Sequence, residues 1–355
     1  MTDFLVIGGG IAGVSVGAKL AALGRVTVLE GESSLGYHAS GRSAALFEQR
    51  YGLPTTIELS VASADEHRAR GVLSDRGLML VGDKDQGAAF AHETAAMEMT
   101  DIGVEAARAI VPILNPEVVG FVSHQTQTWD VDTDKLIQSY ARDVRANGAV
   151  LTGVKVDQIE RLATGWRVHA GDQSWEAAIL VNAAGAWVDE VAAMAGIAPI
   201  GIMPKRRSMA RIPAPGGHDV RGWPMMLGVG ETWYAKPDAG ALIVSPAEEH
   251  DSPPMDAWAD DMVIAEGLAR YEARMTEPVT RLEVTWAGLR SFSPDRNLVL
   301  GPDVADASFV WMAAQGGYGF QTAPAAARLV ADLVAGRAPE LEGATVAALS
   351  PRRFS

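Results

Sequence analysis

The chain has 355 residues, enough for two domains of ordinary size. Lys and Arg number 30 against 44 Asp and Glu, and the resulting net charge of -14 argues against nucleic acids and anionic membrane surfaces as partners. The sequence has no cysteine, which excludes disulfides, thiolate metal sites, thiol nucleophiles and a cofactor tethered through sulfur. It has no signal-like N-terminus and no apolar run of about 18 residues, so we expect a cytoplasmic protein without a membrane span.

The first 30 residues predict a βαβ unit. Residues 4–7 and 25–29 are short apolar runs, typical of buried parallel strands. Residues 11–23 between them carry apolar and small side chains on all sides, as does a helix packed tightly on a sheet. Residues 178–187 and 309–319 predict further strands of the same buried kind.

The helix expected after the last of these strands has its own start and stop signals. Thr322 is a suitable N-cap, Pro324 falls in the first turn, and Gly336 marks the end. The preceding segments differ in pattern: residues 74–82 and 233–246 combine turn signals with alternation, which predicts antiparallel sheet. We expect a loop at residues 248–254 and a helix at residues 256–275.

A glycine-rich turn joins the first strand to the first helix. Gly8, Gly10 and Gly13 form G-x-G-x-x-G, with Ile11 and Ala12 at the mouth of the helix. This pattern gives a tight turn, close backbone approach to a pyrophosphate, and an anion-binding helix N-terminus. Glu30 ends the second strand 22 residues after the first glycine, where a carboxylate can bind a ribose. The spacing predicts a dinucleotide site.

The rest of the sequence decides between a nicotinamide and a flavin dinucleotide. A second small-residue loop, residues 36–47, follows where a nicotinamide domain would continue with a strand. Residues 183–187 and 315–321 add small and glycine-rich segments, the latter just before a helix whose amides suit a reduced flavin ring. No second G-x-G-x-x-G is present for a nicotinamide. We therefore expect non-covalent FAD, with electrons supplied by the substrate itself.

The expected cofactor contacts come from all of these segments. They are Gly8, Gly10, Ile11, Ala12, Gly13, Glu30, Gly41, Arg42, Ser43, Ala44, Val156, Ala184, Gly185, Trp187, Arg290, Gly316, Gly317, Tyr318, Gly319, Phe320 and Gln321.

The motifs VIGGGIAG…VLE, GRSAA, NAAGAW, TWAGLRSFSPDRNLVLG and AAQGGYGFQT together resemble the D-amino acid oxidase family of FAD enzymes. Within it the sequence is most similar to soluble bacterial D-arginine dehydrogenase and related D-amino acid dehydrogenases. The resemblance extends over nearly the full length and implies an α/β fold. It implies a discontinuous Rossmann-like FAD domain of the glutathione reductase type, residues 1–76, 130–203 and 287–355. An inserted α+β substrate domain, residues 77–129 and 204–286, would carry an antiparallel sheet.

Candidate substrate residues follow from side-chain chemistry and from the resemblance. Arg290 lies among apolar and small residues, and a buried arginine needs an anion such as an amino acid carboxylate. Arg207 is a second candidate, and Tyr234 can donate its hydroxyl to the same carboxylate. In the resembled family the matching positions bind the carboxylate, the residue matching Gly317 receives the amino group, and Tyr51 matches a pocket tyrosine. Each residue also has an alternative in which it binds no ligand. Arg290 would form an internal salt bridge, Arg207 would be a surface charge, and Tyr51 would be an ordinary packing residue.

Two positions depart from D-arginine dehydrogenase. Leu46 stands where that enzyme has a histidine, and Leu78 where it has the glutamate that holds the cationic side chain. A guanidinium facing two leucines would be buried without a partner, so we expect a preference for neutral, apolar side chains. Glu48 is the one residue that could compensate, and we expect its loop to flank the entrance.

No general base or metal site is apparent among the seven histidines. The resemblance implies hydride transfer from Cα to flavin N5, giving an imino acid that hydrolyses to a 2-oxo acid, with an electron acceptor that stays open among a quinone, a dye-like carrier and O2. The substrate could also be an N-methyl amino acid, glycine, a proline analogue or an opine. A 2-hydroxy acid dehydrogenase and a flavin-binding module without activity are less well supported by the same residues.

Overall fold

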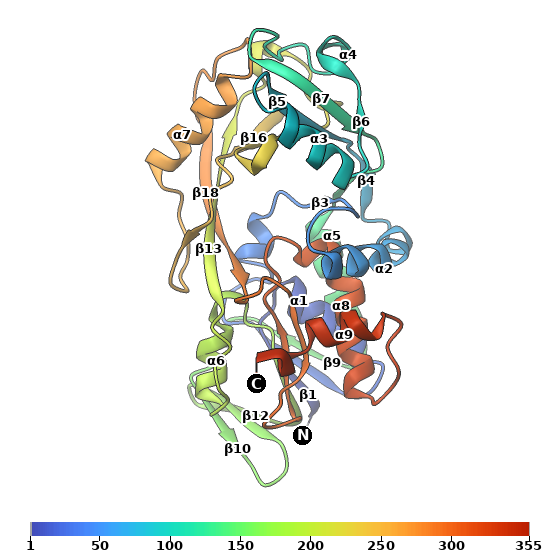
Figure 1. Ribbon diagram of the computed structural model, residues 1–355. Coiled ribbons are helices and arrows are strands. Elements are labelled where there is room, and N and C mark those ends of the chain that lie inside the picture. The colour runs from blue at the N-terminus through green and yellow to red at the C-terminus, as the bar shows by residue number, and fades with distance from the viewer. Residues whose placement is uncertain (1, 355) are drawn as a thin grey trace.

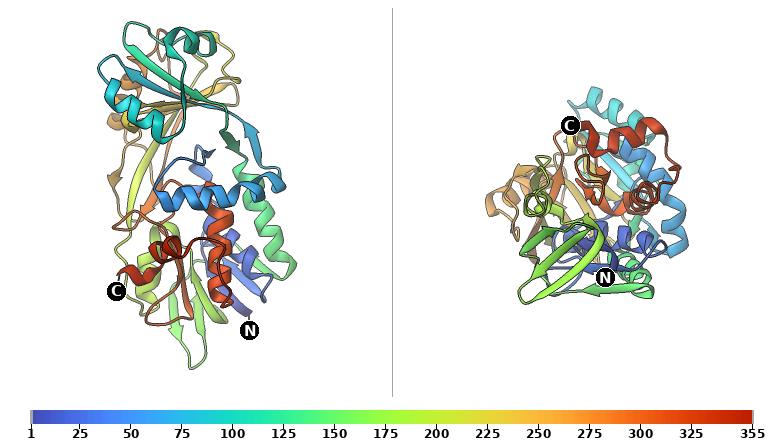
Figure 2. Two further views of the ribbon diagram at one scale, coloured as in Figure 1. Left: turned by 45° about the vertical axis from the view of Figure 1, so that its right-hand side comes forward. Right: turned by 90° about the horizontal axis from the view of Figure 1, so that it is seen from below.

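A computed structural model describes residues 2–354. The molecule has two lobes stacked along its long axis, with the N- and C-terminal ends both in the lower lobe of Figure 1. The turned view on the left of Figure 2 shows the same arrangement.

The lower lobe contains a parallel sheet in the strand order β20-β12-β1-β2-β9. These strands are β1 (Thr2–Ile7), β2 (Val26–Leu29), β9 (Gly148–Leu151), β12 (Gln173–Asn182) and β20 (Phe309–Ala313). The central strand β1 is apolar almost throughout because both of its faces are covered. In register, Val6 lies between Val28 and Val181.

Helices cover one face of this sheet and a mixed layer covers the other. On the first face lie α1 (Ile11–Leu20), α5 (Thr133–Ala146) and α8 (Gly319–Val334), whose apolar residues pack on β1, β2 and β12. On the second face, α6 (Val188–Met194) and the hairpin β10 (Gln158–Arg161) and β11 (Trp166–Ala170) pack on the same strands. Both faces of the sheet are therefore covered, in agreement with the Rossmann-like α/β fold that the sequence predicts.

The upper lobe is built on a second sheet in the order β17-β13-β16-β15-β14-β5-β7-β6, with β18 beside β13. Neighbouring strands are antiparallel except for β14 and β5. The strands are β5 (Leu78–Asp83), β6 (Thr100–Asp101), β7 (Val119–Gln125), β13 (Met203–Ile212), β14 (Met225–Gly228), β15 (Tyr234–Asp238), β16 (Ala241–Ser245), β17 (His250–Asp251) and β18 (Val284–Phe292).

The remaining elements connect and cover these two sheets. A small sheet, β3-β8-β4, lies between the lobes. The remaining bounds are β3 (Leu46–Phe47), β4 (Leu73–Asp75), β8 (Trp129–Val131), β19 (Val299–Pro302), α2 (Pro54–Arg70), α3 (Gly87–Ala96), α4 (Gly103–Ile110), α7 (Asp261–Glu272) and α9 (Gly343–Leu349).

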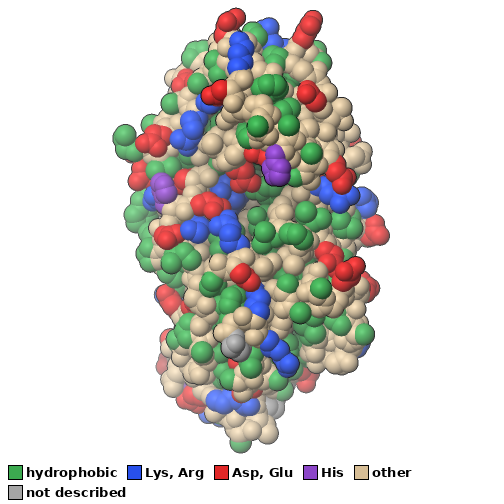
Figure 3. Space-filling model, in the orientation of Figure 1, with side chains coloured by type: hydrophobic (Ala, Val, Ile, Leu, Met, Phe, Trp, Pro, Cys, Tyr) green, Lys and Arg blue, Asp and Glu red, His purple; other side chains and the backbone are tan. Residues whose placement is uncertain are grey.

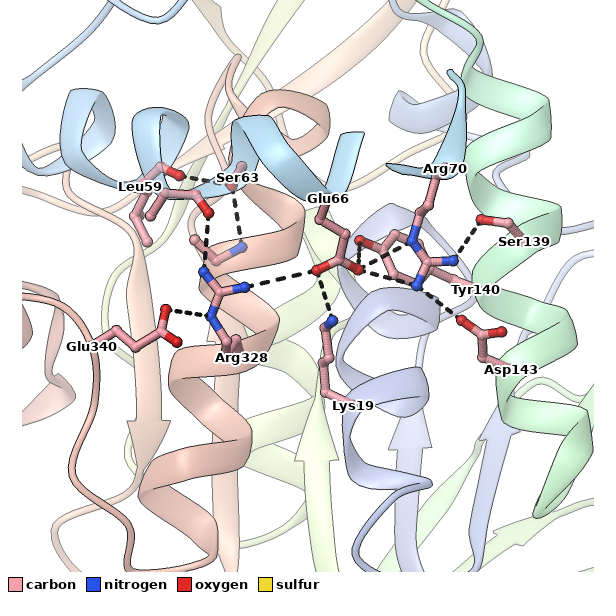
Figure 4. Close-up of polar contacts among 12 residues, drawn as sticks. Lys19, Leu59, Ser63, Glu66, Arg70, Ser139, Tyr140, Asp143, Arg328 and Glu340 are labelled. Carbon is pink, nitrogen blue, oxygen red and sulfur yellow. Dashed lines mark hydrogen bonds and ion pairs between the residues drawn. The ribbon is translucent and has the colours of Figure 1, made fainter. Parts of the chain in front are cut away.

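A polar network fastens α2 to the helices of the lower lobe (Figure 4). Glu66 pairs with Lys19 of α1 at 2.7 Å and with Arg70 of its own helix at 3.0 Å. Arg70 reaches Asp143 of α5 at 2.9 Å. Burial raises the pKa of Glu66, but its bonds to Lys19 and Arg70 outweigh this and hold the pKa below its usual range.

The βαβ unit, the two later strands and the hairpin at residues 233–246 are confirmed, but several bounds differ. The last helix begins at Gly319, so Thr322 is an interior residue whose hydroxyl donates to the Tyr318 carbonyl at 2.9 Å, not an N-cap. The predicted loop at residues 248–254 includes the short strand β17. The helix expected at residues 256–275 is confined to α7, because Asp260 caps the amides of Met262 and Val263.

Two long strands of the upper sheet, β13 and β18, descend on the left of Figure 1 as far as the lower lobe. The expected domain boundary at residue 287 falls inside β18, and the one at residue 203 falls at the start of β13. These two boundaries therefore fall in strands of the upper sheet and not in loops. The exact division of the chain stays a prediction.

The surface seen in Figure 3 intersperses acidic, basic and apolar side chains. Within residues 2–354, no helix is both long and apolar enough to cross a membrane.

Candidate active site

A cavity of about 440 Å³ lies at the carboxyl ends of the parallel strands and extends beneath the upper sheet. Gly8, Glu30, Ala183 and Ala314 line it, each directly after or near the end of β1, β2, β12 or β20. Doubly wound sheets bind their ligands in this position, because the loops leaving adjacent strands diverge there.

The first glycines shape the turn beneath this cavity. Gly8 has φ 109°, and a Cβ there would lie 2.4 Å from the carbonyl oxygen of Ala183. A Cβ on Gly13 would lie 1.8 Å from the carbonyl oxygen of Gly8. These two positions therefore admit only glycine, and their close packing lets the N-terminus of α1 face the cavity.

Glu30 closes the same turn from β2. Its Oε2 accepts a hydrogen bond from the Gly9 amide at 2.6 Å, and its Oε1 accepts one from the Glu32 amide at 2.8 Å. The carboxylate is thus fixed in orientation at the cavity wall, at the position where the spacing predicts a ribose contact.

Most residues expected to bind the cofactor line this one cavity, although they come from widely separated segments. The cavity-lining members are Gly8, Gly10, Ile11, Ala12, Glu30, Arg42, Ser43, Ala44, Val156, Ala184, Gly185, Trp187, Arg290, Gly316, Gly317, Gly319, Phe320 and Gln321. Gly13, Gly41 and Tyr318 are not among its lining residues. Gly13 packs against Gly8, and the Gly41 amide donates to the Gly36 carbonyl at 2.6 Å.

Arg290 lies in the wall of the cavity on β18. Its guanidinium makes no hydrogen bond or ion pair with any residue among residues 2–354, so an internal salt bridge has no partner there. Burial lowers its pKa, but the Tyr51 and Tyr234 hydroxyls and the Glu231 carboxylate outweigh this and keep the pKa above its usual range. Arg290 is therefore a cation with no protein anion in direct contact in the described chain, a state that favours binding of an anionic ligand.

Tyrosine hydroxyls surround this cation. The Tyr234 hydroxyl is buried and has no hydrogen-bond partner in the described chain. Tyr51 lines the cavity, its ring 5.5 Å from that of Tyr318. Burial, followed by the charge of Glu231, raises the pKa of Tyr51, so its hydroxyl stays protonated. Hydroxyl donors and a guanidinium are thus gathered where a carboxylate would be held.

Gly317 packs directly on Arg290. A Cβ at this position would lie 2.9 Å from the Cζ and Nη1 atoms of the guanidinium. The lack of a side chain on Gly317 therefore allows Arg290 to keep its place in the wall.

Arg207 is buried, with only 3% of the residue exposed, so a surface position is ruled out. It lines the cavity, but its Nε donates to the Glu248 carbonyl at 2.9 Å and its Nη2 to Glu249 Oε1 at 3.3 Å. Unlike Arg290, it already has protein partners for its charge.

The upper part of the cavity has apolar walls. They are formed by Leu46, Leu78, Met97, Met209, Met225 and Leu227. Glu48 lines the same part and is buried, with only 3% of it exposed, and the position of its loop beside the entrance stays a prediction. The residues after β3 turn inward, and the Glu48 carboxylate accepts hydrogen bonds from the Arg50 amide at 2.8 Å and from Gln125 Nε2 at 2.5 Å.

The profile of the family described as "DAO: FAD dependent oxidoreductase" matches residues 3–333. The chain belongs to this family. It is 24% identical over 396 residues to FAD-dependent oxidoreductase domain-containing protein 1 of Bos taurus, covering 94% of this chain and 81% of that protein.

Two solved structures show the same fold as this DAO family member. The L-proline dehydrogenase from P. horikoshii superposes with a TM-score of 0.84 at 23% identity, covering 99% of this chain and 97% of the other. Glycine oxidase from Geobacillus kaustophilus superposes with a TM-score of 0.83 at 19% identity, covering 98% of both chains.

FAD is the cofactor of this DAO family member, and the cavity fits it. The crowded glycines at Gly8 and Gly13 leave the strand end open for a pyrophosphate, and Glu30 is held at the cavity wall beside them. Further small residues continue along the cavity to Arg290, as a long ligand requires. When bound, FAD supplies a two-electron acceptor that takes a hydride at N5.

Arg42 holds together two segments of the cavity wall, a role that the sequence did not indicate. Its guanidinium donates to the carbonyls of Ala257 at 2.8 Å and Ala287 at 3.0 Å, and it pairs with Asp256 at 2.5 Å. The side chain therefore ties the loop of residues 36–47 to β18, and only its remaining surface lines the cavity.

Sequence reasoning missed Glu231, which follows β14 and lines the cavity close enough to Tyr51 to raise the pKa of its hydroxyl. It also missed the three methionines of the upper part. None of these residues belongs to a motif. Met209 and Met225 reach the cavity through the pairing of β13 and β14 with other strands, and Met97 reaches it from the end of α3. No local signal could have found them.

Proposed function

We propose that this protein oxidises D-amino acids with neutral side chains, passing the electrons to its FAD. The observation that carries the proposal is the partly buried guanidinium of Arg290 in the wall of the FAD cavity, which is unpaired within residues 2–354. The buried Tyr234 hydroxyl, which also lacks a partner in that range, supports the same conclusion. A guanidinium and a phenol together suit a carboxylate, because both can donate to its two oxygens.

In the proposed reaction the protein orients the substrate and stabilises its charge. Arg290 and Tyr234 hold the carboxylate, and the carbonyl of Gly317 accepts a hydrogen bond from the amino group. The bound FAD would supply the acceptor for the hydride of Cα, while the amine nitrogen loses a proton to water and a C=N bond forms. Water then hydrolyses the imino acid to a 2-oxo acid and ammonia. Rate enhancement comes from positioning, since a well-oriented hydride donor needs no dedicated base.

A second candidate is oxidation of an N-substituted amino acid or glycine. It is supported by the structural similarity to glycine oxidase, to L-proline dehydrogenase and to the iminodiacetate oxidase from Chelativorans sp. BNC1, which superposes with a TM-score of 0.80. Arg290 would serve the carboxylate in either case. The substrate's nitrogen and side chain are therefore what an experiment must vary.

The test is anaerobic bleaching of the flavin absorbance in the purified protein by single amino acids. The panel contains D-leucine, D-norleucine, their L-enantiomers, glycine, sarcosine and proline. Faster bleaching by the D-enantiomers than by all others supports the proposal. Bleaching only by sarcosine, glycine or proline would favour the second candidate, and bleaching by no amine would contradict both.

A further inference from the structure

Glu48 is a buried acid without a counter-ion in the described part of the chain. Only 3% of it is exposed, and it makes no ion pair with a side chain in residues 2–354. Its hydrogen-bond donors, the Arg50 amide and Gln125 Nε2, are both uncharged. A carboxylate in such a place is costly unless a cation reaches it.

The charged groups near Glu48 do not supply that cation. The Arg50 guanidinium, on the same loop, pairs with Glu98 at 3.2 Å and is about half exposed. Glu98, after α3, adds a second negative charge near Glu48. From β7, Gln125 contributes a neutral amide.

Lys236, which contacts the loop before β3, already has protein partners. Its Nζ lies 2.8 Å from Asp130 Oδ1 and donates to the Ala44 carbonyl. Asp130 is in turn paired with Arg76 at 2.7 Å. Glu48 is thus left without a protein cation among the described residues.

Glu48 and Arg290 lie in the wall of one cavity, which Tyr51 and Glu231 also line. Leu46, Leu78 and the three methionines provide walls for an aliphatic chain, but offer nothing to a charge. An amino acid anchored by its carboxylate at Arg290 would extend its side chain along these walls. A long, basic side chain would carry its cation to the buried acid.

We propose that Glu48 determines the side-chain preference of this pocket: its carboxylate binds the cationic end of a long aliphatic side chain, and its protonated form admits an apolar side chain. This inference rests on the proposed oxidation of amino acids. Glu48 would then hold a cationic side chain, which Leu78 cannot do. Neutral substrates would be favoured only while Glu48 is protonated.

The electrostatics of Glu48 agree with the geometry. Burial raises its pKa to about 7, although the Arg50 amide and charge and the Gln125 amide act in the opposite direction. The exchange between the two forms therefore falls near neutral pH. The Lys ε-ammonium has an ordinary pKa of about 10.4 and stays charged in this range.

The test compares kcat/KM for D-lysine and D-norleucine from pH 5.5 to 8.5. The two substrates share a four-carbon side chain, and ionisation of the α-amine affects both, so it largely cancels in their ratio. We expect the lysine-to-norleucine ratio to rise at least tenfold between pH 6 and 8, because kcat/KM follows the ionisation of the free enzyme. Glu48→Gln should give a flat ratio that favours norleucine at every pH.

Controls separate this inference from the proposed function. Glu98→Gln removes a carboxylate outside the cavity and should keep the rise in the ratio. A flat ratio in the wild-type protein, or an unchanged rise in Glu48→Gln, would overturn the role of Glu48 while leaving amino acid oxidation intact. Loss of the rise in Glu231→Gln alone would assign the cation to Glu231 instead. Failure of both substrates to bleach the flavin at any pH would overturn the proposed function as well.

Discussion

Arg290 and Glu48 are opposite charges that the fold places in one cavity without pairing them to each other. Both line the same cavity, and neither has an oppositely charged side chain in contact among residues 2–354. Burying one such charge costs several kcal/mol unless a ligand compensates it. A cavity that holds such a cation and such an acid is therefore suited to a ligand that carries both charges.

Tyr234 offers a direct test of the carboxylate site. Replacing it with Phe removes a hydroxyl that has no partner in the described chain, so the fold and FAD content should not change. A hydrogen bond to a charged group contributes about 1.5–3 kcal/mol, so we expect kcat/KM to fall about 10- to 100-fold. Stopped-flow flavin reduction measures this. An unchanged kcat/KM would place the carboxylate elsewhere.

Gly317 tests the same site through packing. In Gly317→Ala the new Cβ would lie 2.9 Å from the guanidinium of Arg290 and would displace it. We expect kcat/KM to fall by at least tenfold, with the flavin spectrum of the bound cofactor retained. Gly343→Ala, at a position whose Cβ would meet nothing within 4 Å among the described residues, is the matched control. Equal activity of both variants would show that Arg290 does not need its present position.

At the scale of elements, a buried ion pair holds the loop that lines the cavity before β3. Lys236 of β15 pairs with Asp130 of β8 and donates to the carbonyls of Ala44 and Ala45. Ala45 has φ 41°, a backbone conformation that neighbouring contacts must maintain. The pair therefore positions the segment that also carries Leu46 into the cavity.

Lys236→Met should release this segment. Misplacement by about 1 Å can lower a rate up to about 100-fold, so we expect a lower kcat with a smaller effect on KM, and a shifted flavin absorbance maximum. Lys236→Arg keeps the charge and should restore part of kcat. If Lys236→Met lowered only thermal stability, with kcat and the spectrum unchanged, the lysine would serve the fold and not the site.

The contrast between local and long-range signals explains what the sequence could predict. The turn Gly8–Gly13, Glu30 and the hairpin at residues 233–246 were predictable because each depends on neighbouring residues. The burial of Glu48 was not, because Gln125, which holds it, lies 77 residues away. Thr322 was misassigned as a cap because the helix gains a turn from Gly319, which the sequence pattern places in the glycine-rich loop.

At the scale of the molecule, one cavity is formed by both lobes, so FAD should stabilise the whole chain. Free FAD at 100 times its Kd adds about 2.7 kcal/mol to the free energy of unfolding. We expect the Tm of the deflavinated protein to rise by several degrees with added FAD in a single transition, as differential scanning calorimetry would record. Riboflavin, which lacks the pyrophosphate that the Gly8–Gly13 turn is suited to bind, should raise Tm less. A Tm independent of FAD would contradict this coupling.

The most direct test of Arg290 as a carboxylate anchor compares a substrate with its amide. The best D-amino acid of the bleaching panel and its carboxamide differ only in the group that Arg290 is proposed to hold. In anaerobic stopped-flow measurements the acid should reduce the flavin, and the amide should do so with a kcat/KM at least 100-fold lower. Arg290→Met should lose most of this discrimination. Equal reduction of the wild-type flavin by acid and amide, or by neither, would contradict the assignment of Arg290 as the carboxylate anchor of an amino acid oxidising site.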